Sequence, residues 1–331
     1  MSVSAQQSFG RIAVALAALS AFAVMHLALG SKWVPPSNVL SAFYDFDRAN
    51  FDHIVVREMR LPRMLAAMAI GASLSVAGAI MQGVTRNPLA DPGLLGLMSG
   101  ASFGVVIGAG WFGLGSDAWL PFWAAIGSLG AAIVVLAICA MIPQGRSPAV
   151  LLLTGAAVSV FLNSIVAGVN LLNEESFSIF RVWLSGAITN SAATKLGWVW
   201  PWMVAGLGVA LVLARQVTTL SMGHEAATGL GVDVKRLSIA LLLCVVVLTA
   251  SAVALAGPIA FVGLVVPHAT RLFVGSDYRR VIPFAAVFGA GFMIVVDLVA
   301  RSVFAPAEIA TGIVTSFCGA PLFLYLVRKR L

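Results

Sequence analysis

The sequence predicts an all-α protein that crosses a membrane about ten times. Hydrophobic residues make up 60% of the 331 residues and charged residues only 10%, less than half of the share that is usual in soluble domains. The apolar residues form ten runs, and most runs are long enough to cross about 30 Å of hydrocarbon as helices. The whole chain, residues 1–331, is therefore predicted to be a single transmembrane domain.

The predicted spans follow one another along the chain at residues 12–29, 65–84, 94–114, 118–142, 149–172, 196–214, 237–256, 259–270, 281–296 and 309–327. The first is interpreted as a retained span and not a signal peptide, because Arg11 is the one basic residue before it. The run 259–270 is too short to cross alone and follows Gly257-Pro258. We expect a short or broken helix there, buried in protein where irregular backbone is tolerated.

Basic residues are distributed unequally between the two predicted faces. Ten spans place both termini on one side, and the C-terminal run Arg328-Lys329-Arg330 assigns that side to the cytoplasm. In this topology the cytoplasmic face has an excess of eight positive charges and the outer face an excess of one negative charge. The net charge of +7 therefore follows from membrane topology and does not indicate a nucleic-acid partner.

Close helix packing and an absence of catalytic motifs are also visible. Gly96, Gly100, Gly104 and Gly108 recur every four residues, a stripe that favours close approach of another helix. The sequence has no GxxxxGK[ST] motif and no clustered metal ligands. We expect no catalytic residue, metal or cofactor in this chain. An ion-coupled transporter, the alternative of a different class, would need ionisable residues within its spans, but residues 237–270 contain no Asp, Glu, Lys or Arg.

Six motifs occur in a fixed order. Residues 60–63 read RLPR, residues 81–96 contain MQG and RNPLADPGLLG, and residues 257–268 read GPIAFVGLVVPH. The motifs DLVAR and GAP follow at 297–301 and 319–321. Together they resemble the iron-chelate permease family of ABC importers, which includes ferric-citrate, ferric-hydroxamate, haem and cobalamin permeases. The resemblance implies a type II importer permease fold.

The resemblance also implies partners and a function. Such importers combine two permeases, here a second copy or a paralogue, with two cytoplasmic ATPases and a periplasmic or lipid-anchored binding protein. ATP and Mg would be used by the ATPases, and this chain would be no enzyme. The implied function is the permease subunit of an ATP-driven importer for an iron(III) chelate, a ferric siderophore, in a bacterial cytoplasmic (inner) membrane. Haem or cobalamin is the alternative cargo, because residues 92–96 are similar to those branches.

Three arginines are expected to meet the binding protein. Arg60, Arg63 and Arg301 fall on the predicted outer face. They match arginines of the cobalamin permease that pair with glutamates on the two lobes of its binding protein. The resemblance therefore implies that this set docks the loaded binding protein.

Other residues are expected to line and close the path. Asn87 and Leu89 match positions of the family's cytoplasmic gate, and Ser147 lies near a second gate segment. Because Pro88 and Pro92 forbid a continuous helix, the first gate segment must be irregular. Three polar residues of the fifth span are spaced to share parts of one helix face, which predicts that they line the path: Thr154, Ser159 and Asn163.

The long cytoplasmic loop 215–236 is expected to engage the ATPase. It contains Glu-Ala-Ala followed by glycine, which is similar to part of the loop by which ABC permeases contact their ATPases. The predicted coupling residues are Glu225, Ala226, Ala227, Gly229 and Gly231.

Overall fold

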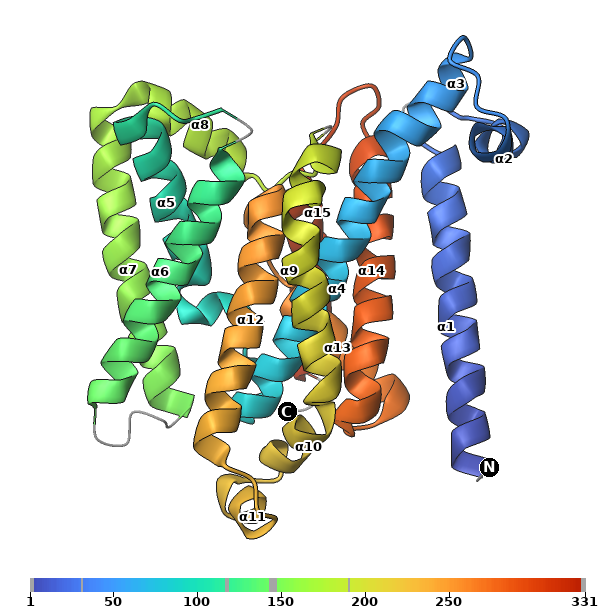
Figure 1. Ribbon diagram of the computed structural model, residues 1–331. Coiled ribbons are helices and arrows are strands. Elements are labelled where there is room, and N and C mark those ends of the chain that lie inside the picture. Colours follow the sequence, from blue (N-terminus) through green and yellow to red (C-terminus); the bar gives the residue numbers. More distant parts are fainter. Residues whose placement is uncertain (1–2, 31, 117–118, 143–147, 190, 329–331) are drawn as a thin grey trace.

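The structure is a computed structural model that describes residues 3–328 except 31, 117–118, 143–147 and 190. Every regular element within these residues is a helix. Seven helices are long and apolar enough to cross a membrane, and three shorter apolar helices bring the set to the predicted ten. The all-α polytopic fold is therefore confirmed. Figure 1 shows these helices standing side by side, with short helices at both ends of the bundle.

The long helices are α1 (Val3–Ala28), α4 (Leu61–Thr85), α6 (Leu120–Met141), α7 (Pro148–Leu172), α9 (Ala192–Val212), α12 (Val234–Ala256) and α14 (Tyr278–Ser302). The shorter spans are α5 (Leu97–Phe112), α13 (Val262–Val274) and α15 (Thr311–Arg328). The connecting elements are α2 (Pro36–Tyr44), α3 (Phe51–Ile54), the π-helical turn η1 (Val55–Arg60), the 3₁₀ turn η2 (Pro92–Leu95), α8 (Glu174–Leu184), α10 (Ala214–Ser221) and α11 (His224–Gly229). We call the upper end of the bundle in Figure 1 the α8 end and the lower the α11 end.

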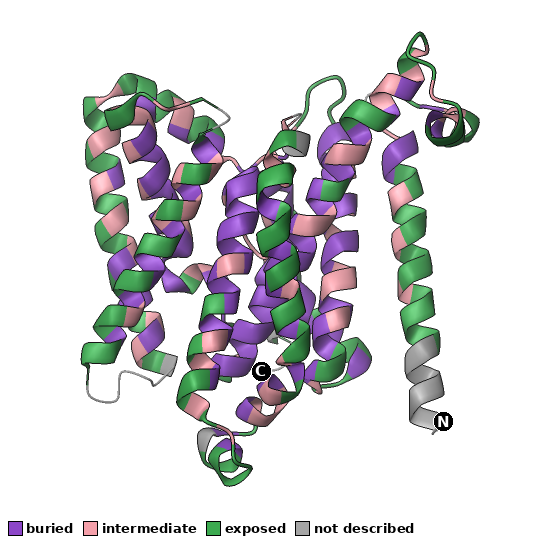
Figure 2. Ribbon diagram, in the orientation of Figure 1, coloured by how far each residue is buried: buried purple, intermediate pink, exposed green. Residues whose placement is uncertain are grey.

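Helix α4 forms the centre of the bundle and packs against α9, α12, α13 and α14. Figure 2 shows it buried along most of its length. Two pairs of glycines bring backbones into direct contact: a Cβ at Gly71 would overlap Gly289 of α14, and one at Gly78 would overlap Gly263 of α13. Within lipid, such close contact takes over the role that the hydrophobic effect has in water. The centre therefore depends on small residues.

The predicted glycine stripe lies where α5 packs on α6. A Cβ at Gly100 or Gly104 would overlap the carbonyl of Gly127 or Trp123 on α6, respectively. Gly96 instead precedes α5, where its φ of +75° makes it the left-handed cap residue. The packing interpretation of the stripe is therefore confirmed, with its first member serving as a cap.

The predicted break before the eighth span is also present. Gly257 ends α12 with a φ of +75°, and Phe261 has a φ of +69° directly before α13. The residues between them are not helical, and Ile259 is buried. Pro258 and Ala260 are half-buried and line a cavity, so the irregular segment lies against protein on one side and a cavity on the other, where such backbone is tolerated at membrane depth.

Candidate functional site

A buried group of charged residues lies at the α8 end of the bundle, where α1, α4 and α14 meet. Its centre is Asp297, whose carboxylate accepts from His26 Nε2 at 2.9 Å and from Arg63 Nε at 3.0 Å. Thr311 Oγ1 donates to the other oxygen at 3.3 Å. Arg301 Nε lies 3.3 Å away, close enough for an ion pair but not aligned for a hydrogen bond. We call these residues, with Arg60, the Asp297 cluster.

The cluster also holds the end of α1. Arg60 Nη1 donates to the carbonyls of Leu27 and Ala28 at 2.7 and 2.9 Å, and Arg301 Nη2 donates to that of His26 at 3.2 Å. The last carbonyls of a helix have no partner within it and carry partial negative charge. The two guanidinium groups therefore act as a C-terminal cap that comes from other helices.

The three arginines that were expected to dock a binding protein are thus brought together. Arg60, Arg63 and Arg301 are only 5–6% exposed. Their nitrogens are used mainly within the chain, and Arg63 Nη1 reaches the surface by pairing with the half-exposed Glu308 at 2.8 Å. In this conformation each of the three is already occupied by carboxylates or carbonyls of the chain. Their docking role stays a prediction.

The expected gate lies between α4 and η2. Asn87 Oδ1 accepts from Leu89 N at 2.9 Å, which closes a tight turn of the kind that asparagine favours. This turn leaves the Leu89 side chain exposed. Arg86 before it has a φ of +52°. Ser147 lies outside the described residues. The geometry gives Asn87 a turn-forming task, and the gate itself stays a prediction.

The expected coupling loop forms a compact projection at the α11 end, made of α10, α11 and the turn to α12 (Figure 1). Ala227 is fully buried in it, while Glu225 and Ala226 are exposed. Two large apolar side chains, Met222 and Leu230, are 70% and 67% exposed. The projection therefore exposes two large apolar side chains together with the Glu225 carboxylate.

Glycine is required at one position of this projection. Gly231 has a φ of +79°, and its amide donates to the carbonyl of Thr228 at 2.9 Å. A side chain would meet no other atom there, so strain would come from the backbone alone. Gly229, the last residue of α11, has neither a positive φ nor a close neighbour. The two glycines of the motif therefore differ in their structural requirement.

A hydrogen-bonded link fixes the projection to the bundle. Thr218 Oγ1 donates to Asp277 Oδ1 at 3.0 Å and accepts from Tyr278 N at 2.9 Å. Burial alone would raise the pKa of Asp277, but the hydrogen bonds from Arg279 N and the Thr218 hydroxyl outweigh burial and lower it. Asp277 also caps the N-terminus of α14. Helix α10 is thus tied to the start of α14.

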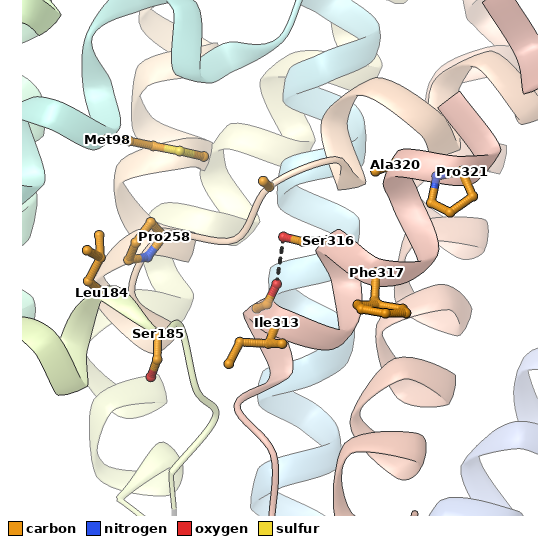
Figure 3. Close-up of a pocket in the computed structure, with 11 residues that line it drawn as sticks. Met98, Leu184, Ser185, Pro258, Ile313, Ser316, Phe317, Ala320 and Pro321 are labelled. Atoms are coloured by element: carbon orange, nitrogen blue, oxygen red, sulfur yellow. Dashed lines mark hydrogen bonds between the residues drawn. The ribbon is translucent and has the colours of Figure 1, made fainter. Parts of the chain in front are cut away.

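Two cavities lie beside α8. The first, of about 630 Å³, is lined by α15 on one side and by Met98, Leu184 and Pro258 on the other (Figure 3). The second, of about 970 Å³, is lined by Ser102 of α5 and by residues of α7 and α8. Leu184 lines both cavities. We call the two cavities together the α5 groove, because Met98 and Ser102, one turn apart on α5, each line one of them.

One of the three expected path residues lines this groove. Asn163 is exposed in the second cavity, whereas Thr154 is buried and the Ser159 hydroxyl donates to the carbonyl of Gly155 at 2.8 Å. Sequence reasoning missed Asn170, which also lines the groove and has a buried Oδ1 without a hydrogen-bond partner among the described residues. The spacing of seven between the two asparagines was a signal that could have found it.

Ten apolar helices around a glycine-packed centre, with a broken span and an end projection, define a polytopic membrane protein. The chain belongs to the FecCD transport family, which it matches over residues 18–329. It is 39% identical to the ferric enterobactin transport system permease protein FepD of Escherichia coli (strain K12), over 92% of this chain and 91% of that one.

Further relatives have other cargo names. The chain is 36% identical to the iron-uptake system permease protein FeuB of Bacillus subtilis (strain 168), over 93% of this chain and 92% of the relative. It is 38% identical to the cobalamin import system permease protein BtuC of Halobacterium salinarum, over 91% and 80%. A solved ABC transporter in an inward-facing conformation matches with a TM-score of 0.83 at 30% identity, over 98% and 99%. The type II permease fold is therefore supported along the whole chain.

Proposed function

We propose that this chain is the membrane-spanning permease subunit of an ATP-driven importer for an iron(III) chelate, a ferric siderophore. The observation that carries this proposal is its similarity, over more than 90% of its length, to permeases named for ferric enterobactin and iron uptake. Cobalamin is the second candidate cargo, because a cobalamin permease is similarly close.

The architecture supports a pump that is driven from outside the chain. The α10–α11 projection offers an exposed apolar and acidic surface for an ATPase, and Gly231 shapes its last turn. The one acidic residue buried in a described span is Asp297, and two arginines and a histidine already hold it. A carboxylate held in this way is poorly suited to carry protons, which disfavours an ion-coupled mechanism.

The assembly that we propose follows the family. A second copy or a paralogue would complete the membrane part, two ATPases would bind the α11 end, and a binding protein would deliver cargo at the α8 end. The chain would lie in a bacterial inner membrane with both termini in the cytoplasm, as the distribution of basic residues predicts.

Reconstitution tests the proposal. The chain, its ATPase and its binding protein are placed in proteoliposomes, and uptake of radioactive iron chelates, haem and cobalamin is compared with and without ATP. We expect ATP-dependent uptake of an iron chelate that persists when ionophores remove all ion gradients. Uptake that needs an ion gradient but no ATP would contradict the mechanism, and uptake of cobalamin alone would favour the second candidate.

A further inference from the structure

The short helix α2 exposes its apolar side. Four of its residues fall within about 100° of the helix circumference, and we call them the α2 arc: Pro36, Leu40, Phe43 and Tyr44. All four side chains are exposed, Leu40 to 61% and Tyr44 to 89%. Residues 36–44 contain no charged side chain. A surface helix of a water-soluble domain has the reverse arrangement, with its apolar stripe toward the core. The α2 arc is therefore suited to an apolar environment.

The other side of α2 is fixed to the rest of the chain by specific contacts. Asn38 Nδ2 donates to Asp52 Oδ2 at 2.9 Å, and the Ser41 hydroxyl and His53 Nε2 share a hydrogen bond of 2.8 Å. Val39 is buried in the apolar cluster that includes the end of α1. Because these contacts decide which side of α2 faces the bundle, the α2 arc must face away from it.

The position of α2 places its arc beside the end of a membrane span. Residues 29–35 are the whole connection from α1 to α2, and Figure 1 shows α2 lying across the end of α1, on the rim of the bundle. Val24 and Met25, near the end of α1, are 54% and 46% exposed. The apolar surface that α1 presents to lipid therefore extends almost to its last turn, and the α2 arc continues it.

Exposed aromatic residues flank α2 along the chain. Trp33 lies directly before it and Phe51 begins α3, which packs against α2, and the two side chains are 60% and 64% exposed. Lys32 Nζ lies 5.3 Å from the ring centre of Phe51 and pairs with Asp52 Oδ1 at 2.8 Å. Aromatic residues collect where a membrane meets water, and lysine there keeps its stem in apolar surroundings and its amine in water. The segment thus has the composition of a membrane interface.

We propose that α2 is an interfacial membrane anchor, whose arc lies among the lipid headgroups and upper acyl chains of the leaflet at the α8 end. Lipid is favoured over a protein partner because the arc is uncharged and continues the lipid-facing surface of α1. A binding protein that leaves after each delivery would return the arc to water, which is unfavourable for apolar surface. The charged residues Asp45, Asp47 and Arg48 follow in the turn to α3 and remain in water. The anchor fixes the depth of the end of α1, which the Asp297 cluster caps.

Spin labels on the full chain test the depth of the arc. Leu40→Cys and, separately, Phe43→Cys are made in a Cys318→Ser background, because Cys318 is the exposed native cysteine and the other two are buried. Arg48→Cys, in the exposed turn after α2, is the matched control. Each protein is labelled with a nitroxide and reconstituted into vesicles of phosphatidylethanolamine and phosphatidylglycerol. Power saturation then compares the access of oxygen, which concentrates in hydrocarbon, with that of a water-soluble nickel chelate.

The ratio of the two accessibilities gives the expected result. Labels at Leu40→Cys and Phe43→Cys should be more accessible to oxygen than to the nickel chelate, so that the logarithm of the ratio is positive. The label at Arg48→Cys should give a negative value. Addition of the binding protein should leave the values at the two arc positions unchanged, because lipid already covers them. All three positions are exposed, so labelling should not disturb the fold.

Three results would overturn the inference. If both arc positions give the same negative value as Arg48→Cys, the arc lies in water and α2 is no anchor. If both reagents are excluded from the arc positions, protein covers the arc, either a second copy of this chain or another subunit. If the nickel chelate reaches the arc until the binding protein is added and is then excluded, the arc is a docking surface for that protein. None of these measurements depends on transport, so they hold whatever the cargo is.

Discussion

The two ends of the bundle differ in how far their charged side chains are buried. At the α8 end, five charged or ionisable side chains are buried together, and Asp297, His26 and Arg63 satisfy one another within the chain. At the α11 end, Glu225 is exposed beside the apolar side chains of Met222 and Leu230. The Asp297 cluster is thus paired mainly within the chain, whereas the projection exposes acidic and apolar side chains.

Burial and pairing within the chain indicate which residues are structural better than residue type does. Arginine is common in docking surfaces, yet the three arginines of the Asp297 cluster cap α1 and neutralise a buried carboxylate. Such groups are expensive to disturb, because a buried charge that loses its partner cannot regain water. Substitution of exposed residues of the projection should change stability little but should weaken association with the ATPase. Four predictions test this contrast, from the largest effect to the smallest.

The largest effect is expected at the centre of the α8 end. Asp297→Asn removes the carboxylate that holds Arg63, Arg301 and His26 together, and leaves buried cations without their counter-charge. Breaking a buried pair in this way costs about 3–5 kcal/mol. We expect a large fall in thermal stability and in the amount of inserted protein, measured by fluorescence-detected size exclusion. Wild-type stability of this variant would mean that the cluster is hydrated and that the contrast between the two ends is wrong.

The second prediction concerns Gly231 at the α11 end. Gly231→Val forces a β-branched residue into a φ of +79°, which costs about 1–2 kcal/mol locally. Insertion of the spans should be normal, because a side chain at this position would meet no other atom. ATPase association, or stimulation of ATP hydrolysis by loaded binding protein, should fall sharply. Gly229→Val is the matched control, since its backbone has no such requirement. Normal hydrolysis and uptake with Gly231→Val would show that the projection is only a linker.

The sequence predicted the spans well because hydrocarbon imposes a single strong requirement on them. Apolar length placed all ten helices, and Gly257-Pro258 marked the break before α13. The sequence could not predict that Arg60, Arg63 and Arg301 are buried. Their partners, the carbonyls of α1 and Asp297, are over 25 residues away from Arg60 and over 200 from Arg63 along the chain, and only the packed structure brings them together. The predicted path residues stay a prediction: Asn163 lines a cavity, whereas Thr154 is buried and the Ser159 hydroxyl bonds to its own helix.

The third prediction uses pH at the link between α10 and α14. The Asp277 pKa lies below its ordinary value of 3.8, since hydrogen bonds from Arg279 N and Thr218 to the carboxylate outweigh burial. A depressed pKa stabilises the fold above the ordinary value, and this stability is lost as the pH falls through the folded-state pKa. Thr218→Val should therefore lower the free energy of unfolding by about 0.5–1.5 kcal/mol at neutral pH. The difference in stability between this variant and wild type should become smaller in acid, because the protonated Asp277 carboxyl is a weaker acceptor than the carboxylate. In protein that also has Asp277→Asn, the effect of Thr218→Val on stability should no longer depend on pH. If the effect of Thr218→Val is independent of pH with Asp277 as well, the assigned link is wrong.

The smallest effect is expected at Glu308, where the Asp297 cluster reaches the surface. Glu308 is 48% exposed and pairs with Arg63 at 2.8 Å, so the pair contributes no more than about 1 kcal/mol. Glu308→Ala should leave the Asp297 cluster folded and free one nitrogen of Arg63 for an acidic partner. If that arginine docks the binding protein, affinity for the loaded protein should rise up to about fivefold. Glu58→Ala removes an exposed carboxylate from the same end and serves as control. Equal affinities for the two variants, measured at low salt, would restrict Arg63 to its structural task and leave docking to other residues.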